Sequence, residues 1–103
     1  MKNVGIFIFD DAEVLDFAGP FEVFSVASQI HDHSLFNTFT VAKTKEKVKA
    51  INGLSVNPAY SMADCPDIDI LIIAGGNGTR ALVEDREVMS WLNRSIKKAS
   101  MSM

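Results

Sequence analysis

The sequence predicts an α/β fold built on a mostly parallel sheet. Residues 4–9 and 68–73 are two apolar runs without alternation, the pattern of strands that are buried on both faces. Each run is followed by a segment whose apolar residues recur at helical spacing. Strands that alternate with helices in this way are typical of parallel sheets covered by helices.

The first half of the chain is predicted to form strand, helix and strand. Residues 4–9 are expected to be the central strand of the sheet. A helix is expected to begin at Gly19-Pro20, because proline at the first helical position loses no hydrogen bond. Its end is expected near His31, and a strand rich in Thr, Phe and Val over residues 36–42 follows. The helix stripe expected to pack on the sheet consists of Phe21, Val23, Phe24, Ala27 and Ile30.

The second half is predicted to form a hairpin, a strand and a helix. Asn52-Gly53 lies between residues 48–51 and 54–56 and predicts a two-residue hairpin turn, in which both residues have positive φ. Residues 58–67 are expected to form a loop before the strand at 68–73. An amphipathic helix follows, with Val88, Leu92, Ser95, Ile96 and Ala99 on one side. Such a helix normally delivers another parallel strand, and residues 100–103 suit only its opening.

Composition places the chain among ordinary globular proteins with one domain, which we expect to be a partial one spanning residues 1–103. The 103 residues are 48% hydrophobic and carry a formal net charge of -3. A chain this short has a thin margin of stability, which favours association with a partner. The acidic balance lacks the basic patch that nucleic acid or an anionic membrane requires, so neither is an expected partner. The apolar run after the N-terminus is too short for a signal peptide, and a cytoplasmic protein is expected.

The glycine-rich segment after the second buried strand is the first candidate site. Gly75, Gly76, Asn77 and Gly78 are predicted to turn the backbone sharply and to direct N–H groups at an anion, a carbonyl oxygen or an oxyanion. The alternative is that a turn from strand to helix simply needs glycine. The spacing Gly76-x-Gly78-x-x-Ala81 overlaps the dinucleotide-binding fingerprint. That fingerprint normally follows the first strand of a Rossmann unit, whereas here it follows the last predicted full strand, so a dinucleotide site is not favoured. No cofactor is expected.

Asp16 is the second candidate, since it follows the first strand and is expected at the carboxyl edge of the sheet, where open α/β folds bind ligands. There it could exchange a proton with a nucleophile or substrate. The alternative is a solvated or helix-capping acid. His31 and His33 lack nearby further ligands for a metal site, so none is expected. Cys65 is the one cysteine, so an internal disulfide is excluded. It lies in a loop without a neighbouring histidine, and a catalytic nucleophile is not expected there.

Three segments together resemble the ThiJ/PfpI superfamily, whose members are also described as class I glutamine-amidotransferase-like. They are residues 4–10, 15–24 and 69–80. The specific part is the Asp-x-x-Gly-Pro-x-Glu-Val-Phe block that starts at Asp16. The block is similar to the branch that contains isonitrile hydratase and the amidotransferase-like N-terminal domains of AraC-type transcriptional regulators. The resemblance covers nearly the whole chain, but only about the first half of a family domain.

The resemblance implies a flavodoxin-like three-layer α/β/α sandwich that is usually dimeric. It further implies a cysteine on a strained turn after the next strand, assisted by an acid that matches Asp16. Backbone groups matching Gly75 and Gly76 would face the same pocket. In hydratase chemistry the thiolate attacks the isonitrile carbon, and water completes conversion to an N-substituted formamide. The segment that carries this cysteine would begin near Ser102, so the 103 residues are expected to be inactive in that chemistry.

Three readings of function follow. The first is the N-terminal part of an isonitrile hydratase-like enzyme that acts on a small molecule and lacks its nucleophile within these residues. The second is a domain that senses a ligand or interacts without catalysis, as in the AraC-type regulators. The third is a half-domain that self-associates, most simply as a dimer, through an uncovered sheet edge and apolar helix face.

Overall fold

The structure, a computed structural model, describes residues 2–32, 35–76, 78–99 and 101–102. Its main sheet has five strands in the order β5-β2-β1-β6-β7, and every neighbouring pair is parallel. The strands are β1 (Lys2–Phe7), β2 (Phe36–Ala42), β5 (Tyr60–Ser61), β6 (Ile70–Ile73) and β7 (Met101–Ser102). The predicted α/β fold with its central first strand is therefore confirmed.

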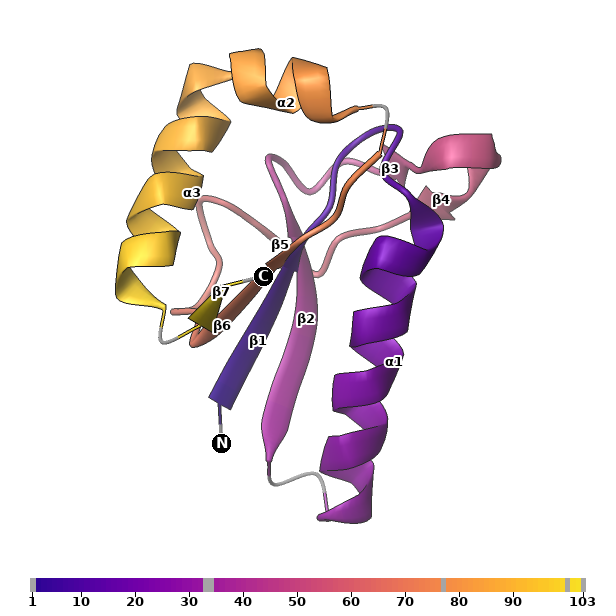
Figure 1. Cartoon of the computed structure of the whole chain (residues 1–103), viewed down its shortest axis with the longest axis vertical. Helices are drawn as coiled ribbons and strands as arrows, with labels where there is room; N and C mark the ends of the chain where they lie inside the picture. Colours follow the sequence, from indigo (N-terminus) through magenta and orange to yellow (C-terminus); the bar gives the residue numbers. More distant parts are fainter. Residues whose placement is uncertain (1, 33–34, 77, 100, 103) are drawn as a thin grey trace.

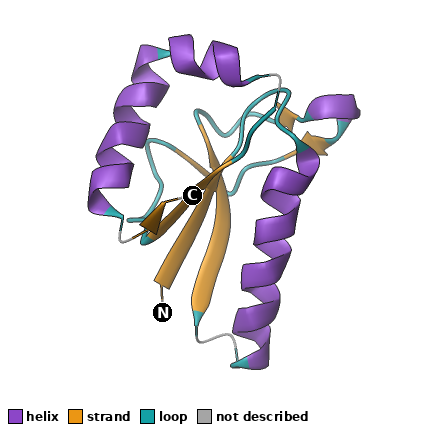
Figure 2. Cartoon of the chain, viewed as in Figure 1, coloured by secondary structure: helices purple, strands orange, loops and turns teal. Residues whose placement is uncertain are grey.

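Helices cover both faces of the sheet, which gives the three layers (Figure 1). α1 (Val14–Ile30) packs on one face against β1, β2 and β6. α2 (Thr79–Glu84) and α3 (Arg86–Lys98) lie on the other side, where the Trp91 ring of α3 is 5.5 Å from the ring of Phe7. Figure 2 shows the sheet between these layers. The largest fully buried side chains belong mainly to the strands and the residues that follow them: Phe7, Ile6, Ile8, Leu71, Val4, Val41 and Val88.

The start of α1 differs from the prediction, because the helix begins at Val14 and Pro20 lies inside it. One local and one tertiary hydrogen bond fix the backbone just before this start. The N–H of Ala12 donates to the Phe9 carbonyl, and the N–H of Glu13 donates to the Gly75 carbonyl at 2.8 Å. With Glu13 held in an extended conformation at the N-cap, the chain enters the helix at once. Pro20 has no N–H for the helix hydrogen bond to residue 16, a loss that the surrounding packing tolerates.

The face of α1 that packs on the sheet also differs from the prediction. Phe17 and Ser28 are buried, and Phe24 packs edge-on against Phe36 at 5.0 Å. Phe21, Val23 and Ile30, which were expected to pack, are exposed, the last two largely so. The Ser28 hydroxyl donates to the Phe36 carbonyl and accepts from the Phe36 N–H, which ties the helix to the start of β2. Because α1 is apolar around most of its circumference, its pattern could not define the packed face.

The predicted hairpin is confirmed, but its turn is wider than expected. β3 (Val48–Lys49) and β4 (Ser55–Val56) pair antiparallel with Val48 opposite Val56. The turn is a short 3-10 helix, η1 (Ile51–Gly53), instead of a two-residue turn. In it, the N–H of Ala50 donates to the Leu54 carbonyl, and Gly53 has a φ of +86°. The N–H of Ile51 donates to the Ala12 carbonyl, so docking on that loop stabilises the wider turn.

The part of the chain that follows the hairpin contains two elements that the sequence pattern did not predict, β5 and α2. The short β5 pairs with the end of β2 inside the expected loop, and α2 is separated from α3 by Asp85. Asp85 begins α3 as its N-cap, where its Oδ1 accepts from the Val88 N–H at 3.2 Å. On the predicted apolar side of α3, Val88 and Leu92 are buried while Ile96 is exposed. The expected opening of a further strand is confirmed by β7, which pairs with β6.

Candidate functional site

The candidate site lies where β1 and β6 end side by side. The two strands are parallel neighbours with Phe7 opposite Ile73, so the loops that follow both emerge at the same edge of the sheet. The first loop leads into α1 and the second into α2. This edge, outside the carboxyl ends of the strands, is where open α/β folds bind ligands.

Asp16 and Gly75 meet at this edge, as the sequence positions indicated. Oδ2 of Asp16 accepts a hydrogen bond from the Gly75 N–H at 3.0 Å. Asp16 lies in the first turn of α1, where the helix dipole favours a negative charge. Its other oxygen, Oδ1, accepts no hydrogen bond from the residues that the structure describes, and the side chain is exposed. The carboxylate is thus oriented by one oxygen, and the second is accessible to a ligand or a proton donor.

The glycines after β6 pack closely against the loop after β1. Ala12 and Gly76 form an isolated antiparallel bridge, and Gly76 has a φ of +128°. A Cβ on Gly76 would lie 2.7 Å from the Asp11 carbonyl oxygen and 2.8 Å from the Glu13 nitrogen. A Cβ on Gly78 would overlap the carbonyl oxygen of Asp10. Close packing of the two loops therefore explains why glycine is needed at positions 76 and 78, without any ligand.

Gly75 differs from its neighbours, because a Cβ there would contact only the Asp16 carboxylate, at 3.0 Å. Its N–H, one of the donors predicted for an anion or oxyanion, is directed at the Asp16 carboxylate. Asn77, another predicted site residue, lies outside the described residues. The roles assigned to Gly75, Gly76, Asn77 and Gly78 remain predictions.

Residues of the loop after β1 contribute to the site, although sequence reasoning did not select them. Glu13 donates its N–H to the Gly75 carbonyl, and Asp10 Oδ1 accepts from the Lys49 N–H at 3.0 Å. Asp11 has a φ of +64°, a conformation that aspartate tolerates better than most residues. The pair Asp10-Asp11 directly after an apolar strand was the available signal for a structured turn. On the other loop, the Thr79 hydroxyl donates to the Gly76 carbonyl at 2.7 Å.

Cys65 lies far from this edge, because it precedes β6 whereas Gly75 follows it. Burial raises the pKa of the Cys65 thiol to about 11, and the carboxylates of Asp64 and Asp67 add to the effect. Its Sγ donates to the Pro66 carbonyl at 3.2 Å. A thiol with this pKa is almost entirely protonated at neutral pH, so it is a poor nucleophile.

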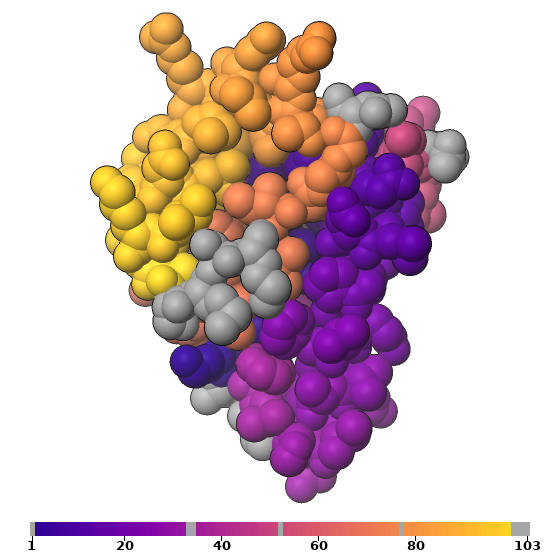
Figure 3. All heavy atoms as spheres, in the orientation of Figure 1, coloured from indigo at the N-terminus to yellow at the C-terminus, as the bar shows by residue number. Residues whose placement is uncertain are grey.

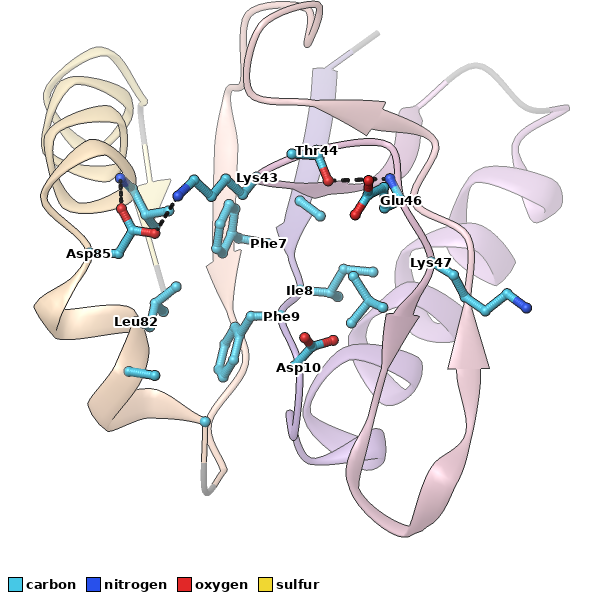
Figure 4. A pocket seen from close by; sticks show the side chains of 15 residues that line it. Phe7, Ile8, Phe9, Asp10, Lys43, Thr44, Glu46, Lys47, Leu82 and Asp85 are labelled. Atoms are coloured by element: carbon cyan, nitrogen blue, oxygen red, sulfur yellow. Dashed lines mark hydrogen bonds and ion pairs between the residues drawn. The ribbon is translucent and has the colours of Figure 1, made fainter.

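A cavity adjoins the site, but its lining does not include Asp16 or Gly75 (Figure 4). Its volume is about 440 Å³, and it lies between α2, the start of α3 and the segments that follow β1 and β2. Phe7, Ile8 and Phe9 form an apolar floor, and Lys43 binds Asp85 across one side at 2.7 Å. The hydrogen bond from Lys43, together with that from the Val88 N–H, lowers the pKa of the Asp85 carboxyl.

The described residues also bear on metal binding and on membrane insertion. No group of three or more His, Cys, Asp or Glu side chains there could hold a metal ion. His31 is the C-cap residue of α1, and His33 lies outside the described part of the chain. None of the helices in that part is long and apolar enough to span a bilayer.

Comparison with known proteins agrees with this architecture. The chain is 25% identical over 97 residues to an isonitrile hydratase from Pseudomonas putida. The matched segment covers 94% of this chain and 40% of that protein. It is 24% identical to the HTH-type transcriptional regulator GbdR from Pseudomonas aeruginosa, of which it covers 26%. The crystal structure of a ThiJ/PfpI family protein from Pseudomonas syringae superposes with a TM-score of 0.86 at 23% identity, over 98% of this chain and 40% of that one.

The chain thus spans less than half the length of these relatives. Residues 2–102, nearly the whole chain, match the DJ-1/PfpI family. The parallel sheet, the helices on both faces and the loops that meet after β1 and β6 fit that match. The chain therefore belongs to the DJ-1/PfpI family.

Proposed function

We propose that this chain supplies the acid and the glycine turn of a DJ-1/PfpI-type site for cysteine-dependent hydration of a small molecule, resembling isonitrile hydratase. The observation that carries the proposal is the hydrogen bond from the Gly75 N–H to Asp16 Oδ2. It holds an acid at the carboxyl edge of the sheet while leaving Oδ1 accessible. An acid placed in this way can take a proton from a thiol and later return it.

The thiol must come from outside these residues, because Cys65 is remote and its pKa is raised to about 11. β7 lies parallel to β6, with Met101 opposite Ile70 and Ser102 opposite Leu71. A polypeptide that continues β7 in this register runs along β6 toward Ile73 and then Gly75. A cysteine on that continuation would approach the Asp16 carboxylate.

In the proposed reaction, the thiolate forms a bond to the terminal carbon of R–N≡C and a proton adds at the same carbon, which gives the thioimidate R–N=CH–S–enzyme. Water then adds to the resulting thioimidate, and cleavage of its carbon–sulfur bond releases the N-substituted formamide and regenerates the thiol. Asp16 is proposed to mediate proton transfer in these steps. The net reaction consumes one isonitrile and one water and requires no cofactor.

A chimera tests this proposal. Residues 1–103 are joined to the part of the Pseudomonas putida hydratase that lies beyond the matched segment, and conversion of a small alkyl isonitrile to its formamide is followed by mass spectrometry. We expect the chimera to turn over and the 103 residues alone to be inactive. In the chimera, Asp16→Asn should lower kcat by about 100-fold or more and change the pH profile, as expected for loss of a general acid or base.

The matched control is Cys65→Ser in the same chimera, which should leave the rate unchanged. A folded but inactive chimera, beside an active parent hydratase, would refute the proposal. Turnover by the 103 residues alone that disappears in Cys65→Ser would refute it as well.

A ligand-sensing role without catalysis is the second candidate, favoured by the match to a transcriptional regulator and by the 440 Å³ cavity beside the site. The apolar floor and the charged rim of the cavity suit a small amphipathic ligand. The reading frame after residue 103 discriminates between the two roles. A cysteine within a few residues of Met103 supports the enzyme, whereas a basic helical region without that cysteine supports the sensor.

A further inference from the structure

The cavity beside the candidate site has a flat apolar floor. It has a volume of about 440 Å³ and lies between α2, the start of α3 and the segments that follow β1 and β2 (Figure 4). The rings of Phe7 and Phe9 stack on its floor, with centroids 6.5 Å apart and planes 30° apart. Further apolar side chains complete the lining: Ile8, Ala42, Val48, Leu82 and Val88. We call this space the phenylalanine cavity, and its size and apolar lining are those of a small-molecule site.

The charged groups at the rim of the phenylalanine cavity do not balance. Lys43 and Asp85 form an ion pair at 2.7 Å, so these two charges largely neutralise each other. Lys47, another cation of the lining, extends away from the floor (Figure 4). Asp10 and Glu46 also line the cavity, and neither forms an ion pair within the described residues. The rim therefore combines one neutral pair with two carboxylates whose charge is not compensated by an ion pair.

We propose that the phenylalanine cavity binds a small organic cation, a protonated amine whose apolar body lies on Phe7 and Phe9 and whose ammonium group binds Asp10. The inference rests on the ligand-sensing role proposed above and gives that role a ligand class. It is independent of the isonitrile chemistry, because neither Asp16 nor Gly75 lines the cavity.

Asp10 is placed to bind such an ammonium group. It directly follows Phe9, and Figure 4 shows its carboxylate beside the floor of the cavity. Its Oδ1 accepts from the Lys49 N–H at 3.0 Å, whereas Oδ2 accepts no hydrogen bond from the described residues. The backbone of Asp10 is fixed as well, because Gly78 packs directly on its carbonyl. A carboxylate that is held in this way loses little freedom on binding and offers a charge-assisted hydrogen bond.

The same charges disfavour other classes of ligand. An anion would meet two carboxylates, while the nearby Lys43 is already bound to Asp85. A divalent metal ion needs several oxygen ligands, and no group of three or more His, Cys, Asp or Glu side chains among the described residues could hold one. A wholly apolar ligand would remove water from Asp10 and Glu46 without replacing it. An amine with an apolar body suits both the floor and the rim.

The first experiment compares probes that share one body and differ in charge, by two-dimensional ¹H–¹⁵N NMR of the 103-residue chain. Phenethylammonium is a cation, phenethyl alcohol is neutral and phenylpropionate is an anion. Phenethylammonium should shift the amide resonances of residues that line the cavity, with a dissociation constant between about 0.1 and 1 mM. Phenethyl alcohol should bind more weakly by about 10-fold or more, and phenylpropionate should leave these resonances unchanged.

The second experiment removes the acid. Asp10→Asn should weaken phenethylammonium binding by about 10-fold or more, because the charge is lost while an amide oxygen can still accept from the Lys49 N–H. The matched control is Glu84→Gln, which removes a negative charge from an exposed side chain of α2 outside the cavity lining. The segment that contains α2, orange in Figure 3, lies along the upper border of the molecule with side chains that project into solvent. Since solvent screens this charge, the control should bind within about 2-fold of the parent chain.

The third experiment blocks the space itself. Ala81 lines the cavity from α2, so the ring of Ala81→Phe should occupy the space above the floor and abolish amine binding. Val83→Phe is the matched control, because Val83 is 60% exposed and does not line the cavity. This control should bind like the parent chain. Near-UV circular dichroism of Trp91 checks that all four variants are folded.

Absence of resonance shifts with both phenethylammonium and n-hexylammonium at about 10 mM would overturn the proposal. Equal binding of phenethyl alcohol and phenethylammonium would also overturn it, although a ligand-sensing cavity would then remain. An Asp10→Asn variant that binds the amine as tightly as the parent chain would refute recognition by Asp10. The hydratase chimera reports separately, because no isonitrile takes part in these measurements.

Discussion

Asp16 Oδ2 accepts a hydrogen bond from the Gly75 N–H at 3.0 Å, which joins the first turn of α1 to the turn after β6 across 59 residues of sequence. Asp16→Ala should lower the free energy of unfolding by about 1 kcal/mol, because the bond involves a charged acceptor but is exposed to solvent. Asp16→Asn should lower it less, since its amide oxygen can still accept. Urea denaturation measures both changes.

Glu84→Ala is the control for this pair, since Glu84 is an exposed acid on α2 with no hydrogen bond among the described residues. Its effect should stay within about 0.5 kcal/mol. Equal stability of Asp16→Ala and the parent chain would show that the bond contributes nothing in solution.

Gly76→Ala should destabilise the fold strongly, by about 3 kcal/mol or more, because a Cβ at φ +128° meets the backbone of Asp11 and Glu13. Gly53→Ala provides the comparison. Gly53 also has a positive φ, at +86°, but no atom lies within 4 Å of its added Cβ, so only the conformational cost of about 1 kcal/mol applies. Thermal unfolding of the two variants separates steric overlap from backbone strain, and similar losses would contradict the close packing of the two loops.

Acid should destabilise the protein partly through Asp64. The hydrogen bond from Lys45, followed by that from the Ser61 N–H, lowers the pKa of the Asp64 carboxyl to about 2. A carboxyl whose pKa is lower in the folded state stabilises the fold above its unfolded pKa of about 4. That contribution is lost as the pH falls from about 4 to about 2.

Denaturation measured across this pH range should therefore show a smaller loss of stability for Asp64→Asn than for the parent chain. Asp67→Asn is the control, as Asp67 is a nearby acid that forms no ion pair within the described residues. Added salt should reduce the effect of Asp64, because its ion pair is exposed. Identical pH profiles for Asp64→Asn and the parent chain would rule out this contribution.

Cys65 should react slowly with iodoacetamide in the folded protein. Its pKa of about 11, two units above the ordinary value of 9.0, lowers the thiolate fraction by about 100-fold at neutral pH. Alkylation followed by mass spectrometry at pH 7.5 should be slower by at least that factor than in urea-unfolded chain. A folded rate equal to the unfolded rate would contradict the burial of the thiol.

The sequence predicted the elements whose patterns are strong and local. The unalternating apolar runs predicted β1 and β6 within two residues, and β2 was predicted at its observed bounds. Asn52-Gly53 located the hairpin. For the site, the order of strand, loop and acid was enough to place Asp16 and the glycines at one edge, because parallel strands end on the same side of a sheet.

The local sequence pattern gave wrong or missing elements where contacts between residues distant in sequence determine the structure. α1 begins at Val14 because the N–H of Glu13 finds its acceptor on Gly75, which no window around Pro20 can reveal. β5 has only two residues and exists because β2 offers an edge to pair with. The hydrogen bond from the Gly75 N–H to Asp16 could not be predicted from the pair of adjacent glycines, because its acceptor lies 59 residues away in the sequence.

The sequence by itself determined the α/β order, the family to which the chain belongs, and the two segments that form the candidate site. Only the tertiary structure decided which face of α1 packs on the sheet, and therefore which face is left exposed. The reason is physical: an apolar helix can bury any of its sides with similar gain, so the choice depends on the position of Phe36, Ser28 and the loop after β6 in space.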